Sequence, residues 1–281
     1  MTPKYDLTDV TVSIFTKSLT SKNTTNCLRR LPSGVLVLLF EGSLLHRFVI
    51  ERNKAVQLGE VEDLQLTGFN FSRNCNLTAK FVETDWTLLL NDDCFVTEGC
   101  VEETLRIAQK TSADIVGAKL FDPLGRLRNR GLIIDKRYRH GFAFDERDSN
   151  EEYSETDGVS GAYILVRTEL LRKIPFDDNY LMGYEDIDFS MRAKRLGSKL
   201  VIANRATATH LMSSSSAPFS IQIKKARSAS YFFAKYPGFK SYSREFFELV
   251  YGPTWSVRRM LSRSHKFVGT LKKLGLNVHE N

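Results

Sequence analysis

The sequence lacks an apolar run long enough to cross a membrane. Its longest such run, residues 34–40, falls far short of the roughly 20 residues that a transmembrane helix needs. The first residues, 1–6, do not form the basic stretch followed by an apolar one that is typical of a secretory signal peptide. We therefore expect a cytoplasmic protein without a membrane-spanning helix.

Cysteine is also scarce, with four residues in a chain of 281. Cys27, Cys75, Cys94 and Cys100 include no Cys-x-x-Cys pair, which argues against a zinc knuckle and against a disulfide framework. We expect reduced, mostly buried thiols. The sequence shows no Ser-His-Asp or Cys-His arrangement of the kind that covalent nucleophilic catalysis uses.

Acidic residues are nearly absent from the end of the chain. The whole protein has 40 Lys and Arg against 33 Asp and Glu, a net charge of +7, and from Pro218 onward twelve basic residues face three acidic ones. Such a segment is typical of binding to lipid headgroups, a phosphorylated substrate or nucleic acid, and the alternative is a solvated helical face. We place a domain boundary near residue 216, between a first unit of residues 1–216 and a basic-aromatic helical extension of residues 217–281.

Short apolar runs alternate with helical patterns through the first two thirds of the chain, which predicts an α/β fold. Strands separated by helices indicate a mostly parallel sheet covered on both faces. A polar segment from Asp135 to Asp157 is expected to be a long loop. The strands are predicted at residues 10–15, 35–40, 63–66, 86–90, 113–120, 163–166 and 199–203, and the main helices at residues 21–31, 44–58, 97–111 and 184–196.

Two adjacent carboxylates, Asp92 and Asp93, follow the predicted strand 86–90 directly. Ligands of an open α/β sheet bind at the carboxyl ends of its strands, and carboxylates in that place suit Mg²⁺ or Mn²⁺. The alternative is a turn or a helix N-cap, where Asn and Asp are also favoured. His210 follows the last predicted strand and is either a structural histidine or a third metal ligand.

A second acidic group, Glu185, Asp186 and Asp188, lies at the start of the last of these helices. An ionised carboxylate at the mouth of a site can act as a general base toward an attacking hydroxyl group. The alternative is structural, because acids in a first helical turn complement the helix dipole, and Asp188 with Arg192 forms an i,i+4 pair.

The order of these motifs and of several further segments resembles that of the family 2 glycosyltransferases, especially the bacterial polysaccharide enzymes described as rhamnosyltransferase-like. Each motif alone is weak, but their shared order over residues 10–216 is specific. The matching segments are Gly68-Phe-Asn-Phe-Ser-Arg-Asn74, Trp86-Thr-Leu-Leu-Leu-Asn-Asp-Asp93, Phe121-Asp-Pro-Leu-Gly-Arg-Leu-Arg-Asn-Arg-Gly131, Val159-Ser-Gly-Ala-Tyr-Ile-Leu-Val-Arg167, Phe176-Asp-Asp-Asn-Tyr180, Gly183-Tyr-Glu-Asp-Ile-Asp-Phe-Ser-Met-Arg192 and His210.

The resemblance implies a GT-A fold and an inverting glycosyltransferase. It implies Mn²⁺ or Mg²⁺ as cofactor, a UDP- or dTDP-sugar as donor, and a saccharide or lipid-linked saccharide of surface polysaccharide synthesis as acceptor. By position, Asp186 is implied as the catalytic base, Glu185 as the weaker candidate, and Asp188 as orienting the acceptor or the base. The other implied site residues are Asp93, Asp92 and His210 at the metal, with Asp92 at the metal or the ribose, and Thr16, Glu41, Asn74, Gly161 and Ala162 around the nucleotide and the donor sugar.

The sequence departs from the family pattern after the first two strands, where it has Thr16-Lys17-Ser18 and then Glu41 in place of the family's Asp. Two other functions stay open. A nucleotidyltransferase would normally carry a Gly-rich segment and a Lys near the N-terminus, and neither is evident. A non-catalytic carbohydrate- or nucleic-acid-binding protein is disfavoured because four carboxylates in one pocket repel each other without a cation, and we expect no nucleic-acid partner.

The apolar residues of the extension are interleaved with Lys and Arg. A helix of this kind can lie in the interface of an anionic membrane, so peripheral binding at the inner face of the cytoplasmic membrane is one expectation. The alternatives are packing onto the first unit and a contact between two copies in a homodimer. The apolar residues concerned are Trp255, Leu261, Phe267, Val268, Leu271 and Leu274.

Overall fold

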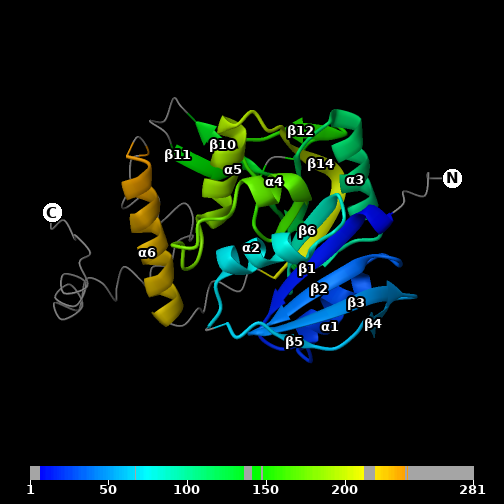
Figure 1. Ribbon diagram of the computed structural model, residues 1–281. Helices are drawn as coiled ribbons and strands as arrows, with labels where there is room; N and C mark the ends of the chain where they lie inside the picture. The colour runs from blue at the N-terminus through cyan, green and yellow to red at the C-terminus, as the bar shows by residue number, and fades with distance from the viewer. Residues whose placement is uncertain are drawn as a thin grey trace.

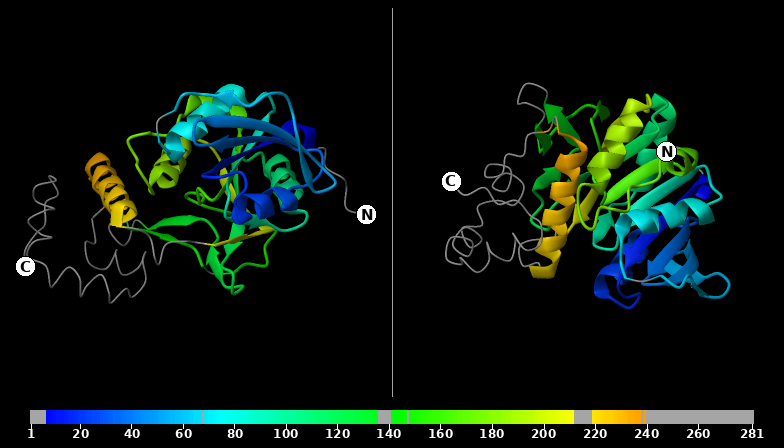
Figure 2. Two further views of the ribbon diagram at one scale, coloured as in Figure 1. Left: turned by 90° about the horizontal axis from the view of Figure 1, so that it is seen from below. Right: turned by 60° about the vertical axis from the view of Figure 1, so that its left-hand side comes forward.

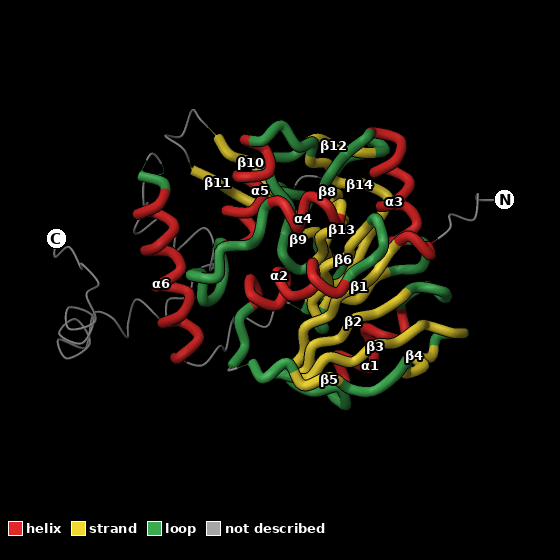
Figure 3. Tube along the Cα trace, in the orientation of Figure 1, coloured by secondary structure: helices red, strands yellow, loops and turns green. Residues whose placement is uncertain are grey.

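The computed structural model describes residues 7–66, 68–135, 141–146, 148–211, 219–237 and 239 (Figure 1, Figure 3). The helices are α1 (Lys22–Arg30), α2 (Phe71–Phe81), α3 (Cys100–Thr111), α4 (Thr168–Lys173), α5 (Glu185–Arg195) and α6 (Phe219–Lys235), with a 3-10 helix at Leu7–Asp9. The strands are β1 (Val10–Thr16), β2 (Leu36–Glu41), β3 (Leu44–Glu51), β4 (Lys54–Gln57), β5 (Glu62–Asp63), β6 (Trp86–Asn91), β7 (Cys94–Val96), β8 (Ile115–Phe121), β9 (Leu127–Asn129), β10 (Leu132–Asp135), β11 (Gly141–Phe144), β12 (Tyr153–Glu155), β13 (Tyr163–Arg167) and β14 (Leu200–His210).

One large sheet joins most of the strands, in the order β12-β14-β8-β13-β6-β1-β2-β3-β4, and β10 and β11 form a small separate sheet. Strand β1 is parallel to β2 and to β6, and β14 is parallel to β8. Strand β13 is antiparallel to both β6 and β8, so these two strands run in the same direction. The C-terminal ends of β14, β8, β6, β1 and β2 therefore all lie along one side of the sheet. This line of strand ends is the shared edge of the sheet, and the predicted mostly parallel core is confirmed.

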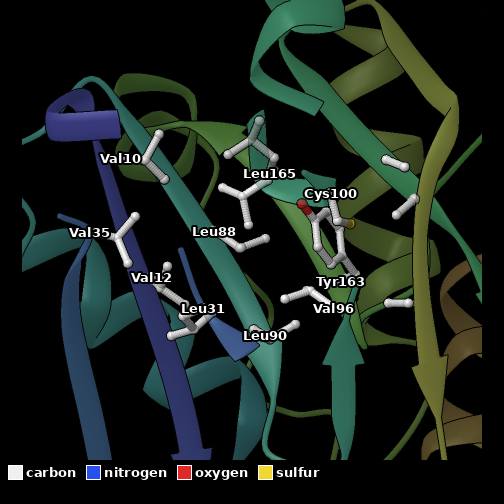
Figure 4. Packing of buried hydrophobic residues seen from close by; sticks show 14 of the residues in the cluster. Val10, Val12, Leu31, Val35, Leu88, Leu90, Val96, Cys100, Tyr163 and Leu165 are labelled. Atoms are coloured by element: carbon white, nitrogen blue, oxygen red, sulfur yellow. The ribbon is translucent and has the colours of Figure 1, made fainter. Parts of the chain in front are cut away.

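Helices cover both faces of this sheet. On one face, apolar side chains of α1 and α3 pack against β1, β6 and β14 in the largest buried cluster, part of which is shown in Figure 4. On the other face, α2, α4 and α5 pack against the same strands in a second cluster. Strand β1 is buried along its whole length, as expected for an apolar strand between two helical layers. The four cysteines are free and buried, which confirms the expectation of reduced, buried thiols.

The prediction of a helix at residues 44–58 is wrong, because this segment forms the hairpin of β3 and β4. Glu51 pairs with Lys54 across a two-residue turn, and both turn residues, Arg52 and Asn53, have positive φ angles. A two-residue turn with φ above zero at both positions matches the right-handed twist of a hairpin. Side chains of β3 alternate between buried and half-buried positions, which is the pattern of a strand with one face on the core.

Two further expectations need correction. The last predicted strand continues well beyond residue 203, because β14 passes an irregularity between Ala203 and Thr207 and ends at His210. The segment from Asp135 to Asp157 is not one continuous loop, since it includes β11 and also β12, which pairs with β14 at the edge of the sheet.

Helix α6 lies outside the two helical layers, beside α5 (Figure 1, Figure 2). A third buried cluster joins the two helices, with Phe232 and Tyr236 from α6 and the residue after it, and Tyr184, Ile187 and Met191 from the start and first turns of α5. This first part of the extension thus packs onto the sheet domain. Residues 241–281, and with them the apolar residues from Trp255 to Leu274, lie outside the described residues. None of the described helices combines the length and the apolarity that crossing a membrane requires.

Candidate active site

The strand ends at the shared edge of the sheet bring most of the predicted site residues together. Thr16 ends β1, Glu41 ends β2, and His210 ends β14. Strand β13 is antiparallel to β6, so its first residues lie at the same edge. Ala162 directly precedes β13, and its carbonyl accepts from the N–H of Asn91 at the end of β6 at 3.1 Å. Residues far apart in the sequence therefore meet because their strands run in the same direction.

Asp93 and His210 form one pair at this edge. The Oδ1 atom of Asp93 lies 3.2 Å from Nε2 of His210, and both side chains are partly exposed. The pairing of β7 with β14 sets this contact, since Cys94 stands opposite His210, and the N–H of Leu211 donates to the carbonyl of Asp93 at 3.1 Å. One carboxylate and one imidazole are donors that suit Mn²⁺ and related divalent cations.

Asp92 makes its contacts on the β1 side of the site. The hydroxyl of Thr16 donates to Oδ2 of Asp92 at 2.7 Å, and the hydroxyl of Thr24 at the start of α1 approaches the same atom at 3.4 Å. Partial burial, together with the charge of Asp93, raises the pKa of Asp92 above its usual value. The Asp92 carboxylate is thus oriented by the hydroxyl groups of Thr16 and Thr24.

The Asp93 carboxylate and the His210 imidazole could hold a divalent cation as its two protein ligands. Across residues 7–239, leaving aside the gaps between the described segments, no three His, Cys, Asp or Glu side chains are grouped so as to hold a metal ion. A metal with only Asp93 and His210 as close protein ligands would take its remaining ligands from water and from a bound diphosphate, which is how Mg²⁺ and similar ions are often held beside nucleotides.

The N-terminus of α5 places Asp186 against the entry to β13. The N–H of Gly161 donates to Oδ2 of Asp186 at 2.8 Å, and the N–H of Ile187 donates to Oδ1 at 2.9 Å. A Cβ atom at Gly161 would lie 3.4 Å from that carboxylate and 3.6 Å from the ring of Phe71. Because Gly161 precedes the residue bonded to Asn91, only a short stretch of backbone separates the Asp186 carboxylate from the Asp92-Asp93 motif.

Glu185 lies beside Asp186 and is half-buried. Burial and the neighbouring charge of Asp186 raise the pKa of Glu185 well above its usual value, and Lys225 of α6 opposes this rise. The Oε2 atom of Glu185 has no hydrogen-bond partner among the described residues. Burial also raises the pKa of Asp186, although two backbone N–H groups favour its ionised form. Both carboxyl groups therefore have raised pKa values, and the backbone N–H groups that bond Asp186 favour ionisation of Asp186 over that of Glu185.

Asp188 is fully buried, and both of its carboxylate oxygens have partners. Its Oδ2 atom accepts from Nε of Arg192 at 2.7 Å, so the i,i+4 pair expected from the sequence is present. Its Oδ1 atom accepts from the hydroxyl of Tyr236 at 2.6 Å, from the hydroxyl of Tyr180 at 3.3 Å and from Nζ of Lys235 at 2.8 Å. Asp188 thus joins α5 to α6 and its neighbouring residue, two residues after Asp186 in the same helix.

We expect Asp188→Ala to lower the free energy of unfolding by about 3 kcal/mol, because removing one partner of a buried ion pair leaves the other charges uncompensated. Urea unfolding followed by circular dichroism measures this loss. The matched control is Asp178→Ala, at an exposed position in the loop before α5, which should change stability by less than about 0.5 kcal/mol. Equal stabilities for the two variants would contradict a structural role of Asp188.

The remaining predicted residues lie near the same edge, with partners of their own. Glu41 accepts from the N–H of Leu19 at 2.9 Å through Oε1, and its Oε2 lies 3.2 Å from Nε2 of His46. Asn74 in the second turn of α2 is 2% exposed, and its Oδ1 atom has no partner among the described residues. Ala162 is buried beside the end of β6. No contact made by these three residues by itself identifies a nucleotide site.

The structure also shows residues that the sequence analysis did not place near the site. Ser228, Lys235 and Tyr236 belong to the basic extension, yet they contact α5 or the loop before it. The charge of Glu185 in α5 also acts on Lys225 of the extension. The pattern that could have indicated this is the spacing of Ser228, Phe232 and Tyr236, which places small and aromatic residues on one face of a helix.

A family model described as glycosyltransferase like family 2 matches residues 53–229, more than half of the chain. Among solved structures, GalNAc-T7 with UDP, GalNAc and Mn²⁺ is similar with a TM-score of 0.52 and 12% identity, over 85% of this chain and 53% of that one, so this chain spans about half its length. The structure of S. aureus TarS 1-349 is similar with a TM-score of 0.52 and 13% identity, over 85% of this chain and 74% of that one. No curated protein matches the sequence.

Proposed function

This chain belongs to the glycosyltransferase like family 2, and from that premise we propose that it transfers a sugar from a nucleoside-diphosphate sugar to a hydroxyl group of an acceptor, with inversion at the anomeric carbon. Its fold is of the GT-A class, as in the similar structures. The observation that carries the proposal is the segment Gly161–Ala162, which is bonded to the carboxylate of Asp186 and to Asn91, two residues before Asp93 of the pair Asp93–His210.

Asp93 and His210 are the residues we propose to hold a divalent cation, Mn²⁺ or Mg²⁺. Such a cation, when bound, stabilises the negative charge that grows on the departing diphosphate. The similarity to a structure that contains UDP and Mn²⁺ supports a UDP-sugar as donor, with a dTDP-sugar as the alternative. Asp92, held by Thr16 and Thr24, is proposed to contact the nucleotide on the β1 side, and Glu41 and Asn74 are proposed as further contacts of the nucleotide.

Asp186 is the residue we propose as the base. The acceptor oxygen forms a bond to the anomeric carbon while the bond from that carbon to the diphosphate oxygen breaks, and the hydroxyl proton passes to the Asp186 carboxylate. The N–H groups of Gly161 and Ile187 fix the orientation of this carboxylate. Its raised pKa makes it a stronger base than an exposed aspartate.

The acceptor we propose is a saccharide or lipid-linked saccharide used in surface polysaccharide synthesis. This part of the proposal rests on the resemblance of the motifs and on the basic, aromatic composition of the extension, which suits an anionic membrane surface. A homodimer contact through the same extension is the alternative proposal.

A screen of nucleotide sugars tests the function. The purified protein with Mn²⁺ or Mg²⁺ is expected to release UDP or dTDP slowly from one donor by hydrolysis, and calorimetry should detect binding of that nucleoside diphosphate only with the metal present. Release of pyrophosphate from a sugar phosphate and a nucleoside triphosphate would indicate a nucleotidyltransferase instead. Absence of metal-dependent binding for every nucleoside diphosphate would favour a non-catalytic binding protein.

A further inference from the structure

Helix α6 and the residue after it present one continuous face to the sheet domain, made by Lys225, Ser228 and Phe232 of the helix and by Tyr236. The hydroxyl of Ser228, which is buried, accepts from the N–H groups of Leu181 and Met182, each at 2.9 Å. These two residues lie in the loop that leads into α5. These two hydrogen bonds, from backbone N–H groups to the Ser228 hydroxyl, hold α6 against the loop that leads into α5. Figure 1 shows α6 beside this loop.

Aromatic packing fixes the same contact one turn further along α6. The ring of Phe232 lies 5.1 Å from the ring of Tyr184, the residue that directly precedes Glu185. Phe232 is fully buried, and Tyr236 is bonded to the buried carboxylate of Asp188. Three successive turns of α6 therefore follow the loop and the start of α5 in order.

Lys225 lies one turn before Ser228 on this face. Residues three apart on a helix point to the same side, so Lys225 lies on the face of α6 whose Ser228 contacts the loop before α5. Its side chain is half-buried, whereas the neighbouring Lys224 is exposed. The acid whose charge acts on Lys225 is Glu185, and the interaction is mutual.

We propose that α6 completes the active site and that Lys225 is a positioning residue, whose ammonium group supplies positive charge near Glu185, the residue next to Asp186. This inference rests on the proposed function of Asp186 as the base. It assigns a catalytic contribution to a residue of the basic extension, which the composition alone would assign to an anionic surface.

The charges around Glu185 explain why a cation in this place affects the reaction. The groups that act on it are Asp186 in its own helix and Lys225 in α6, while the thiol of Cys75 in α2 is kept neutral by burial. Two adjacent carboxylates hold a proton between them more tightly than either would alone. A nearby ammonium group opposes this, so the base is available at lower pH than it would be without Lys225.

Lys225→Met tests the proposal in the full-length protein, with the pH profile of kcat/KM as the main measurement. Loss of the positive charge should move the acid limb of the profile to higher pH by about one unit. At pH values below the limb, kcat/KM should therefore fall about tenfold. The KM for the donor should stay within about twofold, since the charge lies near Glu185, the residue next to the base. Lys225→Arg should keep the profile of the parent protein.

The matched control is Lys224→Met, which removes the same charge from the next, exposed position of the same helix. It should leave the profile unchanged. A profile of Lys225→Met equal to that of Lys224→Met would overturn the proposal. So would a higher KM for the donor without a shift of the limb, because this would place Lys225 at the diphosphate.

Thermal unfolding separates this inference from the proposed function. An acid whose pKa is raised by folding lowers stability as the pH increases from its unfolded to its folded pKa. Lys225→Met should therefore extend the decline in Tm to higher pH, even in a protein that turns over no donor. Absence of donor turnover in the parent protein would contradict the proposed function, whereas an unchanged pH dependence of Tm would contradict the role of Lys225.

Discussion

Asp186→Asn is expected to lower turnover by about 10²- to 10⁴-fold, the range that a positioned general base contributes. Asparagine can still accept a hydrogen bond from the N–H of Gly161, so the backbone around the site should keep its shape. The affinity for the donor nucleotide should change by less than about twofold, because the lost group acts on the acceptor hydroxyl. Steady-state kinetics and calorimetry with UDP measure the two quantities.

Glu185→Gln is the matched comparison, since it makes the same chemical change at the adjacent residue. Its turnover should stay within about tenfold of the parent protein, because Glu185 is favoured in its neutral form by burial and by the charge of Asp186. If Glu185→Gln instead shows the large loss and Asp186→Asn keeps nearly normal turnover, the base is Glu185. The double variant should resemble Asp186→Asn alone.

The sequence was informative about the site because the relevant residues stand at strand ends. Thr16, Asp92 and Asp93 come at or just after the ends of predicted strands that run the same way, so their meeting follows once a mostly parallel sheet is predicted. His210 reaches the same edge because β14 continues beyond the predicted strand 199–203. The contact of Asp186 with this edge has a different origin. It depends on how α5 sits over the entry to β13, and no local pattern in the sequence describes that packing.

The wrong helix at residues 44–58 and the unpredicted contacts of the extension also have physical causes. The turn at Arg52 and Asn53 adopts positive φ angles without a glycine, so the hairpin signal at residues 44–58 was absent from the sequence. The i,i+4 partner of Asp188 was evident, but its bonds to Lys235 and Tyr236 join residues almost fifty positions apart. Net charge indicated that the extension is basic, whereas the position of Lys225 beside an acid follows from tertiary packing.

Asp93→Ala is expected to weaken metal-dependent binding of a nucleoside diphosphate by roughly 10- to 100-fold or more, since even changes to groups that merely support a metal ligand cost that much. The variant removes the carboxylate that lies 3.2 Å from the imidazole of His210 and leaves His210 alone of the two side chains proposed to hold the cation. Calorimetry with UDP should show the loss in the presence of Mn²⁺ and no difference from the parent protein when a chelator has removed the metal.

Asp85→Ala provides the control, because Asp85 is exposed and directly precedes the opposite end of β6. It removes the same charge from the protein at the far edge of the sheet, so its metal-dependent affinity should match that of the parent protein. If Asp93 binds the cation, only Asp93→Ala should lose affinity for UDP and Mn²⁺. If the loss came only from the change in net charge, both variants should be weakened equally. Equal affinities of Asp93→Ala and Asp85→Ala for UDP and Mn²⁺ would therefore contradict the metal site, while leaving the assignment of Asp186 to be decided by its own kinetics.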